Sequence, residues 1–506
     1  MAETLRSASL FSEEGPSIQD AGNIGGHFRR DRRLDYTLVS MTRALRYHFS
    51  GIAGAGMNPL AQLMRARGHD VQGSDRSFDH GKNQELAGRL RSLGILLHPQ
   101  DGSAIAPGLD RFVYSTAVED DTPEMRAARE LGVERIARPA LLAEIVNDGK
   151  PGVAISGTSG KSTVTGMAAY LVREAGLPVT ALGGAALVGD GTTGCFMAGP
   201  VDGPVIAEAC ESDGTLIGYQ PAIGVIHNIS RDHGEVEALR PQFSTFASNC
   251  RLLFVNARCP EAAALGRARG TRGYGDAPSA DVRLRVEAAG PRRARGILLL
   301  PGGPLVLDVP QPGRHNLENA AAAALVAIEL GVSSEMVASL IARFPGVARR
   351  FEVVGTTSAG IRVVDDYAHN GEKIRAAVTA AQSGASRVLA VFQPHGFGPA
   401  RFLRPELKEL VPSLLRPRDR FCYAEIFYSG GTVARDLSST ALAGDLPEGL
   451  GCGYAADHAA VVRWVQSEAR PQDTVLIMGA RDPDLPRLAR AVFVALDGGR
   501  APKTPA

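Results

Sequence analysis

One stretch of the sequence, residues 152–163, constrains the fold of the chain most strongly. It begins with an apolar, β-branched run and continues through two glycines to a lysine and two hydroxyl side chains, after which a helical pattern starts at Val164. Glycines let backbone N–H groups fold around phosphate oxygens, and the N-terminus of a helix adds partial positive charge. The stretch therefore predicts a strand, a phosphate-binding loop and a helix, in preference to a turn that merely joins two elements.

Two side chains of this loop have the chemistry that a nucleotide phosphate requires. Lys161 can reach the β- and γ-phosphates, and the Ser162 hydroxyl can ligate Mg²⁺. The loop is shorter than a full Walker motif, which would place a glycine at Ile155. The predicted nucleotide-binding residues of the loop are Gly157, Thr158, Ser159, Gly160, Lys161, Ser162 and Thr163.

Two further apolar runs are predicted to be strands that end in polar side chains. Glu208 and Glu211 follow one run, and buried carboxylates are unfavourable unless positive charge such as Mg²⁺ accompanies them. Asn228, Asp232 and His233 follow the other run. The carboxyl ends of parallel strands form the edge at which open α/β sheets bind ligands. We expect these side chains beside the phosphate loop, although an Asp-His pair alone is more often an ordinary loop sequence.

A glycine-rich turn at residues 51–57 opens an earlier part of the chain, between a short strand and a helix that runs to about Arg67. This pattern is typical of a nucleotide or nucleotide-sugar site, but the glycine spacing is not G-x-G-x-x-G and does not support NAD. The alternative is a glycine-rich turn without a ligand. The predicted substrate-binding residues here are Gly51, Ala53, Gly54, Ala55, Gly56, Met57, Ser74, Asp75, Ser115 and Thr116.

The rest of the chain alternates strand and helix patterns. Within residues 271–310, the runs at 281–286 and 296–300 suggest short strands in an insertion, and an alanine-rich helix follows. At its start, His315 and Asn316 can read a base edge or simply cap the helix. Later apolar runs at 362–364, 387–392, 421–425 and 473–478 alternate with helical patterns and predict a doubly wound parallel sheet.

Length and composition limit the class of protein. A chain of 506 residues is too long for one core and predicts about three domains. We expect a disordered tail at 1–45 and domains at 46–149, 150–345 and 346–506. The formal net charge of +1 and the lack of a long apolar run indicate neither nucleic-acid binding nor membrane insertion. Six cysteines without a C-x-x-C pair favour a reduced, cytoplasmic protein over a disulfide framework or a zinc site.

The order of the motifs resembles the Mur ligase family across residues 46–506. Within that family it is most similar to the branch that joins L-alanine to UDP-N-acetylmuramate, with the murein-peptide recycling ligases as close relatives. The blocks that carry the resemblance are 51–57, 157–163, 211–213, 228–233, 313–320, 349–352 and 365–369.

The resemblance implies an α/β protein of three domains. The first would be a Rossmann-like domain for the UDP-sugar, the second a P-loop ATPase domain with a parallel sheet, and the third a Rossmann-like domain for an amino acid or short peptide. It would be a monomer or homodimer. The implied reaction uses ATP and Mg²⁺ and passes through an acyl phosphate, which the amine of the acceptor then attacks.

Residue roles also follow from the resemblance. The implied catalytic residues are Lys161, Glu211, His233, Arg350, Asp366 and His369. The implied Mg²⁺ ligands are Ser162, Glu208, Glu211 and His233. The residues expected to contact the nucleotide outside the loop are Asn228, His315, Asn316, Asn319 and Arg350, and those expected on the acceptor side are His395 and Arg401.

Lys161 is the one lysine between positions 152 and 345, so the carbamylated lysine that later-acting family members use as a Mg²⁺ ligand cannot be built there. This agrees with the alanine-adding branch. The chain departs from that branch at Ser159, usually histidine, and at Cys210, usually aspartate. It also has Asn-Gly at 370–371 in place of His-Pro and lacks a basic residue directly after His395.

The departures near His395 concern the acceptor side and leave the acceptor open. Alternative hypotheses are a recycling ligase that attaches a preformed peptide, a degenerate nucleotide-binding homologue without turnover, and a phosphotransferase outside this family.

Overall fold

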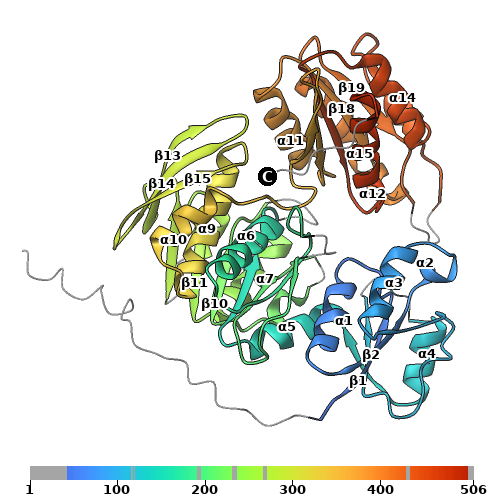
Figure 1. Ribbon diagram of the computed structural model, residues 1–506, viewed down its shortest axis with the longest axis vertical. Coiled ribbons are helices and arrows are strands. Elements are labelled where there is room, and N and C mark those ends of the chain that lie inside the picture. The colour runs from blue at the N-terminus through green and yellow to red at the C-terminus, as the bar shows by residue number, and fades with distance from the viewer. Residues whose placement is uncertain are drawn as a thin grey trace, which may run out of the picture. The chain divides into compact units, whose positions relative to one another are not determined.

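The computed structural model describes residues 43–115, 118, 120–190, 195–212, 214–230, 236–265, 270–428 and 434–499. Three of the residues expected in or beside a site lie outside this set: Thr116, Asp232 and His233. Residues 1–42 of the expected tail also lie outside it. The described chain forms three sheets in sequence order, drawn blue to cyan, green to yellow and orange to red in Figure 1.

The first sheet has five parallel strands in the order β3-β2-β1-β4-β5. Its strands are β1 (Arg46–Ser50), β2 (Asp70–Ser74), β3 (Leu96–His98), β4 (Arg111–Tyr114) and β5 (Glu134–Ala137). The connecting helices are α1 (Met57–Ala66), α2 (Arg76–Asp79), α3 (Gln84–Ser92), α4 (Pro123–Glu130) and α5 (Arg138–Asp148). Because β1 is central, the turn after it lies at the carboxyl edge where such sheets bind ligands.

The second sheet has ten strands in the order β15-β14-β13-β12-β11-β10-β6-β9-β7-β8. Its strands are β6 (Gly152–Ser156), β7 (Thr180–Gly183), β8 (Cys195–Met197), β9 (Val205–Glu208), β10 (Ile223–Ile226), β11 (Leu252–Asn256), β12 (Thr271–Gly275), β13 (Val282–Ala289), β14 (Ala294–Leu300) and β15 (Gly303–Val309). Its helices are α6 (Lys161–Glu174), α7 (Val236–Asn249), α8 (Pro260–Leu265), α9 (Arg314–Glu329) and α10 (Ser334–Ile341). A short 3₁₀ helix, η2 (Thr215–Gly218), follows β9.

One sequence expectation, the insertion at 271–310, needs correction. The strands at 271–310 are not a separate insertion, because β12 pairs with β11 and β13 pairs with β12, both in parallel. The expected parallel sheet is present and is extended at its ends by antiparallel pairs, β14 and β15 beyond β13 and β8 beside β7. The two tight connections between β13, β14 and β15 explain the change, since short turns can join only antiparallel strands.

The alanine-rich sequence of α9 has a packing role. The alanines at positions 320–324 are fully buried, and α9 contacts α6 on one side and β14 and β15 on another, as Figure 1 shows for the strands. Small side chains let the helix lie close to both neighbours. This places the N-terminus of α9 beside the N-terminus of α6, which begins at the phosphate loop.

The third sheet has six strands in the order β16-β17-β21-β18-β19-β20. Its strands are β16 (Glu352–Thr356), β17 (Arg362–Asp366), β18 (Val388–Gln393), β19 (Arg420–Ala424), β20 (Cys452–Ala455) and β21 (Thr474–Gly479). Its helices are α11 (Gly371–Ser383), α12 (Phe397–Leu414), α13 (Ser439–Gly444), α14 (His458–Glu468) and α15 (Leu485–Leu496). The expected parallel sheet is present, with β16 added antiparallel at one edge.

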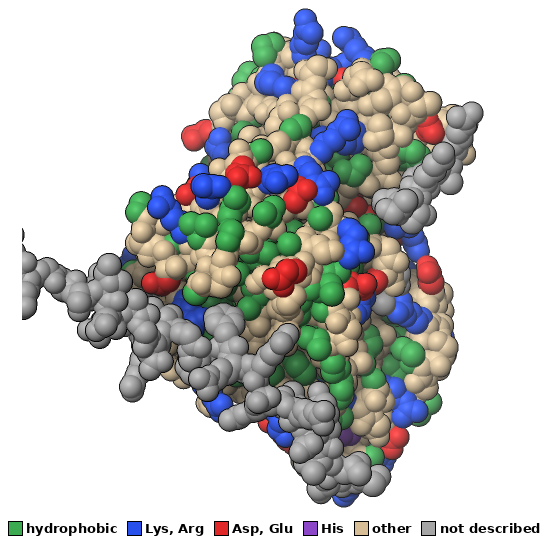
Figure 2. All heavy atoms as spheres, turned by 60° about the vertical axis from the view of Figure 1, so that its left-hand side comes forward, with side chains coloured by type: hydrophobic (Ala, Val, Ile, Leu, Met, Phe, Trp, Pro, Cys, Tyr) green, Lys and Arg blue, Asp and Glu red, His purple; other side chains and the backbone are tan. Residues whose placement is uncertain are grey.

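β15 forms an edge of the ten-stranded sheet and carries Pro304 and Asp308. On the face presented in Figure 2, basic and acidic side chains are interspersed among apolar ones. Across the described residues, no helix combines the length and the apolar character needed to cross a bilayer.

Candidate active site

The loop between β6 and α6 has backbone angles and neighbours that require glycine at two positions. Gly157 and Gly160 have φ angles of +139° and +81°. A Cβ atom at Gly160 would lie 2.7 Å from Oδ1 of Asn319, and one at Gly157 would lie 3.0 Å from the backbone of Asn228. The predicted strand, loop and helix are therefore all present, with the loop closely enclosed by the start of α9 and by the segment after β10.

Asn228 holds the loop in place. Its side-chain Oδ1 accepts hydrogen bonds from the Ser159 N–H at 2.7 Å and from the Thr158 hydroxyl at 3.0 Å. The Thr158 hydroxyl oxygen in turn accepts the Ser230 N–H at 3.0 Å. Because Oδ1 already accepts two hydrogen bonds, Asn228 would affect a bound nucleotide indirectly, by fixing the shape of the loop.

Lys161 begins α6 and is buried together with a carboxylate. Its Nζ lies 2.9 Å from Oε2 of Glu211, and the two residues are 8% and 1% exposed. Burial alone would lower the pKa of Lys161, but the negative charges of Glu211 and Glu208 and the hydrogen bond to Glu211 outweigh it and raise the pKa. The ammonium group therefore remains protonated, as phosphate binding requires.

Carboxylate oxygens on the other side of the loop fit a hard cation. Oε2 of Glu208 accepts hydrogen bonds from the Ser162 hydroxyl and from the Gly184 N–H, each at 2.9 Å. Oε1 of Glu211 is buried and has no hydrogen-bond partner among the described residues. Two carboxylates and a hydroxyl suit Mg²⁺, which usually completes its shell with water and phosphate oxygens.

These residues alone offer a metal ion few ligands. Within the described ranges, no group of three or more His, Cys, Asp or Glu side chains is placed to hold a metal ion. The expected ligand His233 lies outside those ranges. A cation here would therefore depend on oxygens that the nucleotide supplies.

A cavity of about 440 Å³ adjoins the phosphate loop. His315, Asn316 and Asn319, which were expected to contact the nucleotide, lie at the start of α9 and line this cavity. Asn319 Nδ2 donates to Asn316 Oδ1 at 3.1 Å, and Asn316 Nδ2 donates to the Pro312 carbonyl at 2.8 Å. Burial lowers the pKa of His315, so its ring is neutral at neutral pH and can both donate and accept hydrogen bonds.

Sequence reasoning missed several residues of this cavity, notably His227, Glu318 and Lys373. His227 ends the apolar run of β10 directly before Asn228, and its Nδ1 lies 2.6 Å from the Tyr274 hydroxyl. Burial lowers the pKa of His227 to about 4, so the ring is neutral. Its position at a strand end was a usable signal, whereas the other two come from helices α9 and α11, whose sequences carry no comparable pattern.

Arg350 reaches the phosphate loop from the segment before the third sheet. Its Nη2 donates to the Ser162 hydroxyl at 3.2 Å, and its guanidinium carbon lies 4.9 Å from the centre of the Tyr367 ring. Asp366 accepts the N–H groups of Phe351 at 2.7 Å and Ala368 at 2.8 Å. Asp366 therefore fixes the backbone that presents Arg350, and it also lines the cavity.

The glycine-rich turn of the first sheet is held by β2. The N–H groups of Gly51 and Ile52 donate to the Ser74 carbonyl at 2.8 and 2.9 Å. Oδ2 of Asp75 accepts the Ala53 N–H at 2.9 Å, so this acid anchors the turn. A Cβ at Gly56 would lie 3.0 Å from the side chain of Arg138, a cation that sequence reasoning did not select.

Three family models match consecutive parts of the chain. The Mur ligase family catalytic domain matches residues 46–150, the Mur ligase middle domain 155–327, and the Mur ligase glutamate ligase domain 349–481. A UDP-N-acetylmuramate–L-alanine ligase of Kineococcus radiotolerans is 36% identical over 461 residues, which are 87% of this chain and 94% of that protein. The chain belongs to the Mur ligase family.

Other comparisons agree with this membership. The Renibacterium salmoninarum protein of the same name is 41% identical over 372 residues, 70% of this chain and 76% of that protein. The crystal structure of UDP-N-acetylmuramate–alanine ligase from Thermotoga maritima has a TM-score of 0.71 at 24% identity and covers 90% of this chain and 100% of its own, a likeness of fold. Mur ligases are ATP-dependent enzymes that form amide bonds, and this chain is such a ligase.

The residues expected on the acceptor side, His395 and Arg401, are not among those that line the cavity beside the phosphate loop. The rings of His369 and His395 are in contact, with centroids 5.6 Å apart, and Nδ1 of His369 lies 2.8 Å from the Tyr367 carbonyl. Arg401, on α12, forms an ion pair with Asp436 at 2.5 Å. The structure thus brings the two histidines together, whereas the Arg401 guanidinium already has a carboxylate partner.

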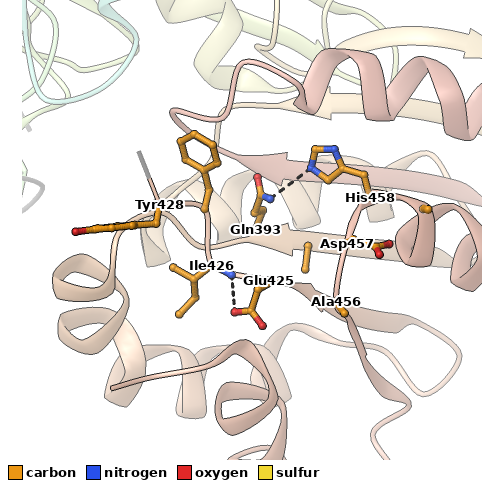
Figure 3. A pocket seen from close by; sticks show the side chains of 10 residues that line it. Gln393, Glu425, Ile426, Tyr428, Ala456, Asp457 and His458 are labelled. Atoms are coloured by element: carbon orange, nitrogen blue, oxygen red, sulfur yellow. Dashed lines mark hydrogen bonds between the residues drawn. The ribbon is translucent and has the colours of Figure 1, made fainter. Parts of the chain in front are cut away.

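A second cavity of this Mur ligase, of about 490 Å³, lies at the carboxyl ends of β18, β19 and β20. Gln393, Glu425 and His458 line it, and Figure 3 shows the side chains of Gln393 and His458 pointing toward each other. Nε2 of His458 lies 3.3 Å from Asp482, and this hydrogen bond raises the pKa of His458. The cavity occupies the sheet edge at which doubly wound domains hold ligands.

Proposed function

We propose that this Mur ligase joins the carboxylate of UDP-N-acetylmuramate to L-alanine in the cytoplasm, using ATP and Mg²⁺. The curated relatives that match most of the chain bear the name of that reaction. The buried Lys161–Glu211 pair carries the proposal, because it joins the cation needed for phosphate to a carboxylate oxygen that has no partner among the described residues.

Two steps make the amide bond. The sugar-linked carboxylate attacks the γ-phosphorus of ATP, the bond to the β-phosphate oxygen breaks, and ADP leaves. The amine of the acceptor then attacks the acyl phosphate carbon, loses a proton and expels inorganic phosphate. Charge spreads over the transferring phosphoryl group, so preorganised cations lower the barrier.

The described residues can be assigned parts in these steps. Lys161 and Arg350 would lie against the phosphates, and Ser162, Glu208 and Glu211 would hold Mg²⁺. His227, His315, Asn316 and Asn319 would surround the adenosine, and Asn228 and Asp366 would hold the backbone around it. His369 and His395 would face the acceptor, with the cavity at the ends of β18, β19 and β20 available to its side chain.

The nucleotide sugar would bind at the first sheet. The turn at 51–57 leads into the N-terminus of α1, whose partial positive charge suits a pyrophosphate. Ser74, Asp75 and Ser115 lie at the ends of β2 and β4 on the same edge.

Product formation tests the proposal. Purified protein is mixed with ATP, Mg²⁺ and UDP-N-acetylmuramate, then with each of a panel of amino acids or a preformed tripeptide, and the amide product and phosphate are measured. We expect L-alanine to give product. Lys161→Ala should lower the rate by about a hundredfold or more, because the phosphoryl charge loses its main protein cation.

Lys150→Ala is the matched control, since Lys150 is 62% exposed and pairs with Asp202 at the surface. It should retain the wild-type rate. If only the tripeptide gives product, the acceptor is a preformed peptide and not L-alanine. Phosphate release that no acceptor changes would contradict the proposed synthesis.

A further inference from the structure

A cluster of polar side chains is buried beneath the glycine-rich turn of the first sheet. His48 and Ser50 come from β1, Ser74 from the end of β2, and Glu124 from the first turn of α4. All four are at most 1% exposed. A charged group this deeply buried is costly unless its hydrogen bonds are complete.

The carboxylate of Glu124 is the centre of this cluster. Its Oε2 accepts the Ser50 hydroxyl at 2.5 Å. Its Oε1 lies 2.9 Å from Nε2 of His48 and also accepts the Ser74 hydroxyl. Three groups from two neighbouring strands therefore converge on one side chain.

The hydrogen-bond pattern fixes the tautomer of His48. The Gln72 amide nitrogen lies 2.9 Å from the Ala104 carbonyl, which can only accept, and 3.2 Å from Nδ1 of His48. Nδ1 must then be the acceptor, so the ring proton is on Nε2 and is donated to Glu124. Burial would raise the pKa of Glu124, but the hydrogen bonds from His48, Ser50 and Ser74 outweigh it and lower the pKa.

The cluster connects directly to the turn. Ser50 immediately precedes Gly51, and the carbonyl of Ser74 accepts the N–H groups of Gly51 and Ile52. Glu124 thus ties together the two strand ends on which the turn is built. It lies inside the sheet edge and is itself shielded from any ligand by these partners.

We propose that Glu124 is a positioning residue for the nucleotide sugar, which fixes the turn at 51–57 in the shape that holds the pyrophosphate. The inference rests on the proposed use of UDP-N-acetylmuramate. It assigns part of the affinity for that substrate to a residue of α4 that makes no contact with it. Loss of the carboxylate should loosen the turn and leave the ATP site unchanged.

Calorimetric binding of UDP-N-acetylmuramate to the full chain, wild type against Glu124→Gln, tests the inference. Glutamine keeps the shape but offers one acceptor oxygen to three donors. We expect the Kd for the nucleotide sugar to rise about tenfold or more, the size of one lost charged hydrogen bond. The KM for ATP should stay at the wild-type value.

Two further variants separate positioning from general stability. Glu144→Gln removes a half-exposed carboxylate that pairs with Arg111 in the same part of the chain and should leave the Kd unchanged. Ser74→Ala removes one of the three donors and should weaken binding less than Glu124→Gln. Melting temperatures are measured for all variants.

A Glu124→Gln protein that melts earlier but binds the nucleotide sugar as tightly as the wild type would overturn the inference. A similar loss of affinity for ATP would overturn it too, because the effect would then be general. If the wild type itself binds neither UDP-N-acetylmuramate nor UDP, the proposed function fails, whereas tight binding that Glu124→Gln leaves intact contradicts the positioning role alone.

Discussion

Single residues around the phosphate loop are restricted by contacts that leave little room for other side chains. Gly160 shows this clearly, since it adopts a positive φ and also lies against His227 and Asn319. The positive φ and the close neighbours each disfavour a larger side chain at Gly160. Their effects can be separated, because Gly176, just after α6, shares the positive φ but has no close neighbours.

Gly160→Ala should abolish measurable ATP-dependent turnover and lower the free energy of unfolding by about 1–3 kcal/mol, since its Cβ would overlap Asn319 Oδ1 at 2.7 Å. Gly176→Ala is the control, with a similar φ of +78° but nothing within 4 Å of the added Cβ. It should lose some stability from backbone strain and keep its activity. Equal loss of activity in both variants would show that strain alone matters.

A pH dependence follows from Asp365, a buried residue of β17. Burial raises its pKa to about 7, helped by Glu352 and Asp366 and opposed by Arg349. Between about pH 4 and pH 7 the folded protein therefore keeps a proton that the unfolded chain has released. The contribution of Asp365 to the free energy of unfolding must fall as pH rises through this window and level off above it.

Asp365→Asn should remove this contribution, so that the difference in unfolding free energy between variant and wild type changes between pH 5 and pH 8. Urea denaturation at several pH values measures it. Asp445→Asn is the control, because the hydrogen bond from Arg404 lowers the pKa of Asp445 and both states are ionised above pH 5. A pH-independent difference for Asp365→Asn would refute the raised pKa.

A residue could be predicted from the sequence when its partners are close to it along the chain. Lys161 and Ser162 were predicted because their neighbours in sequence define the loop. Glu124 was missed because its partners Ser50 and Ser74 are 74 and 50 positions away, and nothing local distinguishes it from a surface acid in the first turn of a helix.

At the scale of elements, the turn before β16 is the most unusual segment. Arg349 and Phe351 have positive φ angles of 59° and 53° without being glycine. Such backbone costs about 1–3 kcal/mol per residue and persists only where the surroundings fix it. Arg349 is fixed by Asp365 at 3.3 Å and Phe351 by Asp366, so Arg350 between them points steadily to Ser162.

Arg350→Lys should therefore lower kcat by about tenfold or more while changing stability little, because lysine keeps the charge but loses the planar stacking on Tyr367. Steady-state kinetics and thermal denaturation measure the two effects. Arg375→Lys, at an exposed position of α11, is the matched control and should behave as wild type. Wild-type kinetics in Arg350→Lys would show that Arg350 does not stabilise the charge on the transferring phosphoryl group.

Elements were predicted well where strand and helix alternate. β6, α6, β17 and β21 match the expected runs, since a buried parallel strand leaves a continuous apolar run. β15 and β16 were missed because both lie at sheet edges and are partly exposed. Their mixed polarity resembles a loop, and only pairing with a distant neighbour makes them strands.

At the scale of the whole molecule, contacts join the phosphate loop to the third sheet region. The Ser230 hydroxyl, which touches Thr158, donates to Glu372 of α11 at 3.1 Å, and Arg350 donates to Ser162. Ligases that close over their substrates assemble such contacts at the reacting end of the nucleotide. The sequence indicated the three units through their motifs, but it could not indicate which side chains bridge them.

The margin of the ten-stranded sheet at β15 has a consequence for the behaviour of many copies together. An edge strand offers its unpaired N–H and C=O groups to other chains, and long, flat, apolar edge strands are the most prone to such pairing. Pro304 has no N–H to offer, and the carboxylate of Asp308 is tied to Arg293 at the surface. Both features lower the tendency of this edge to pair with a strand of another copy of the protein.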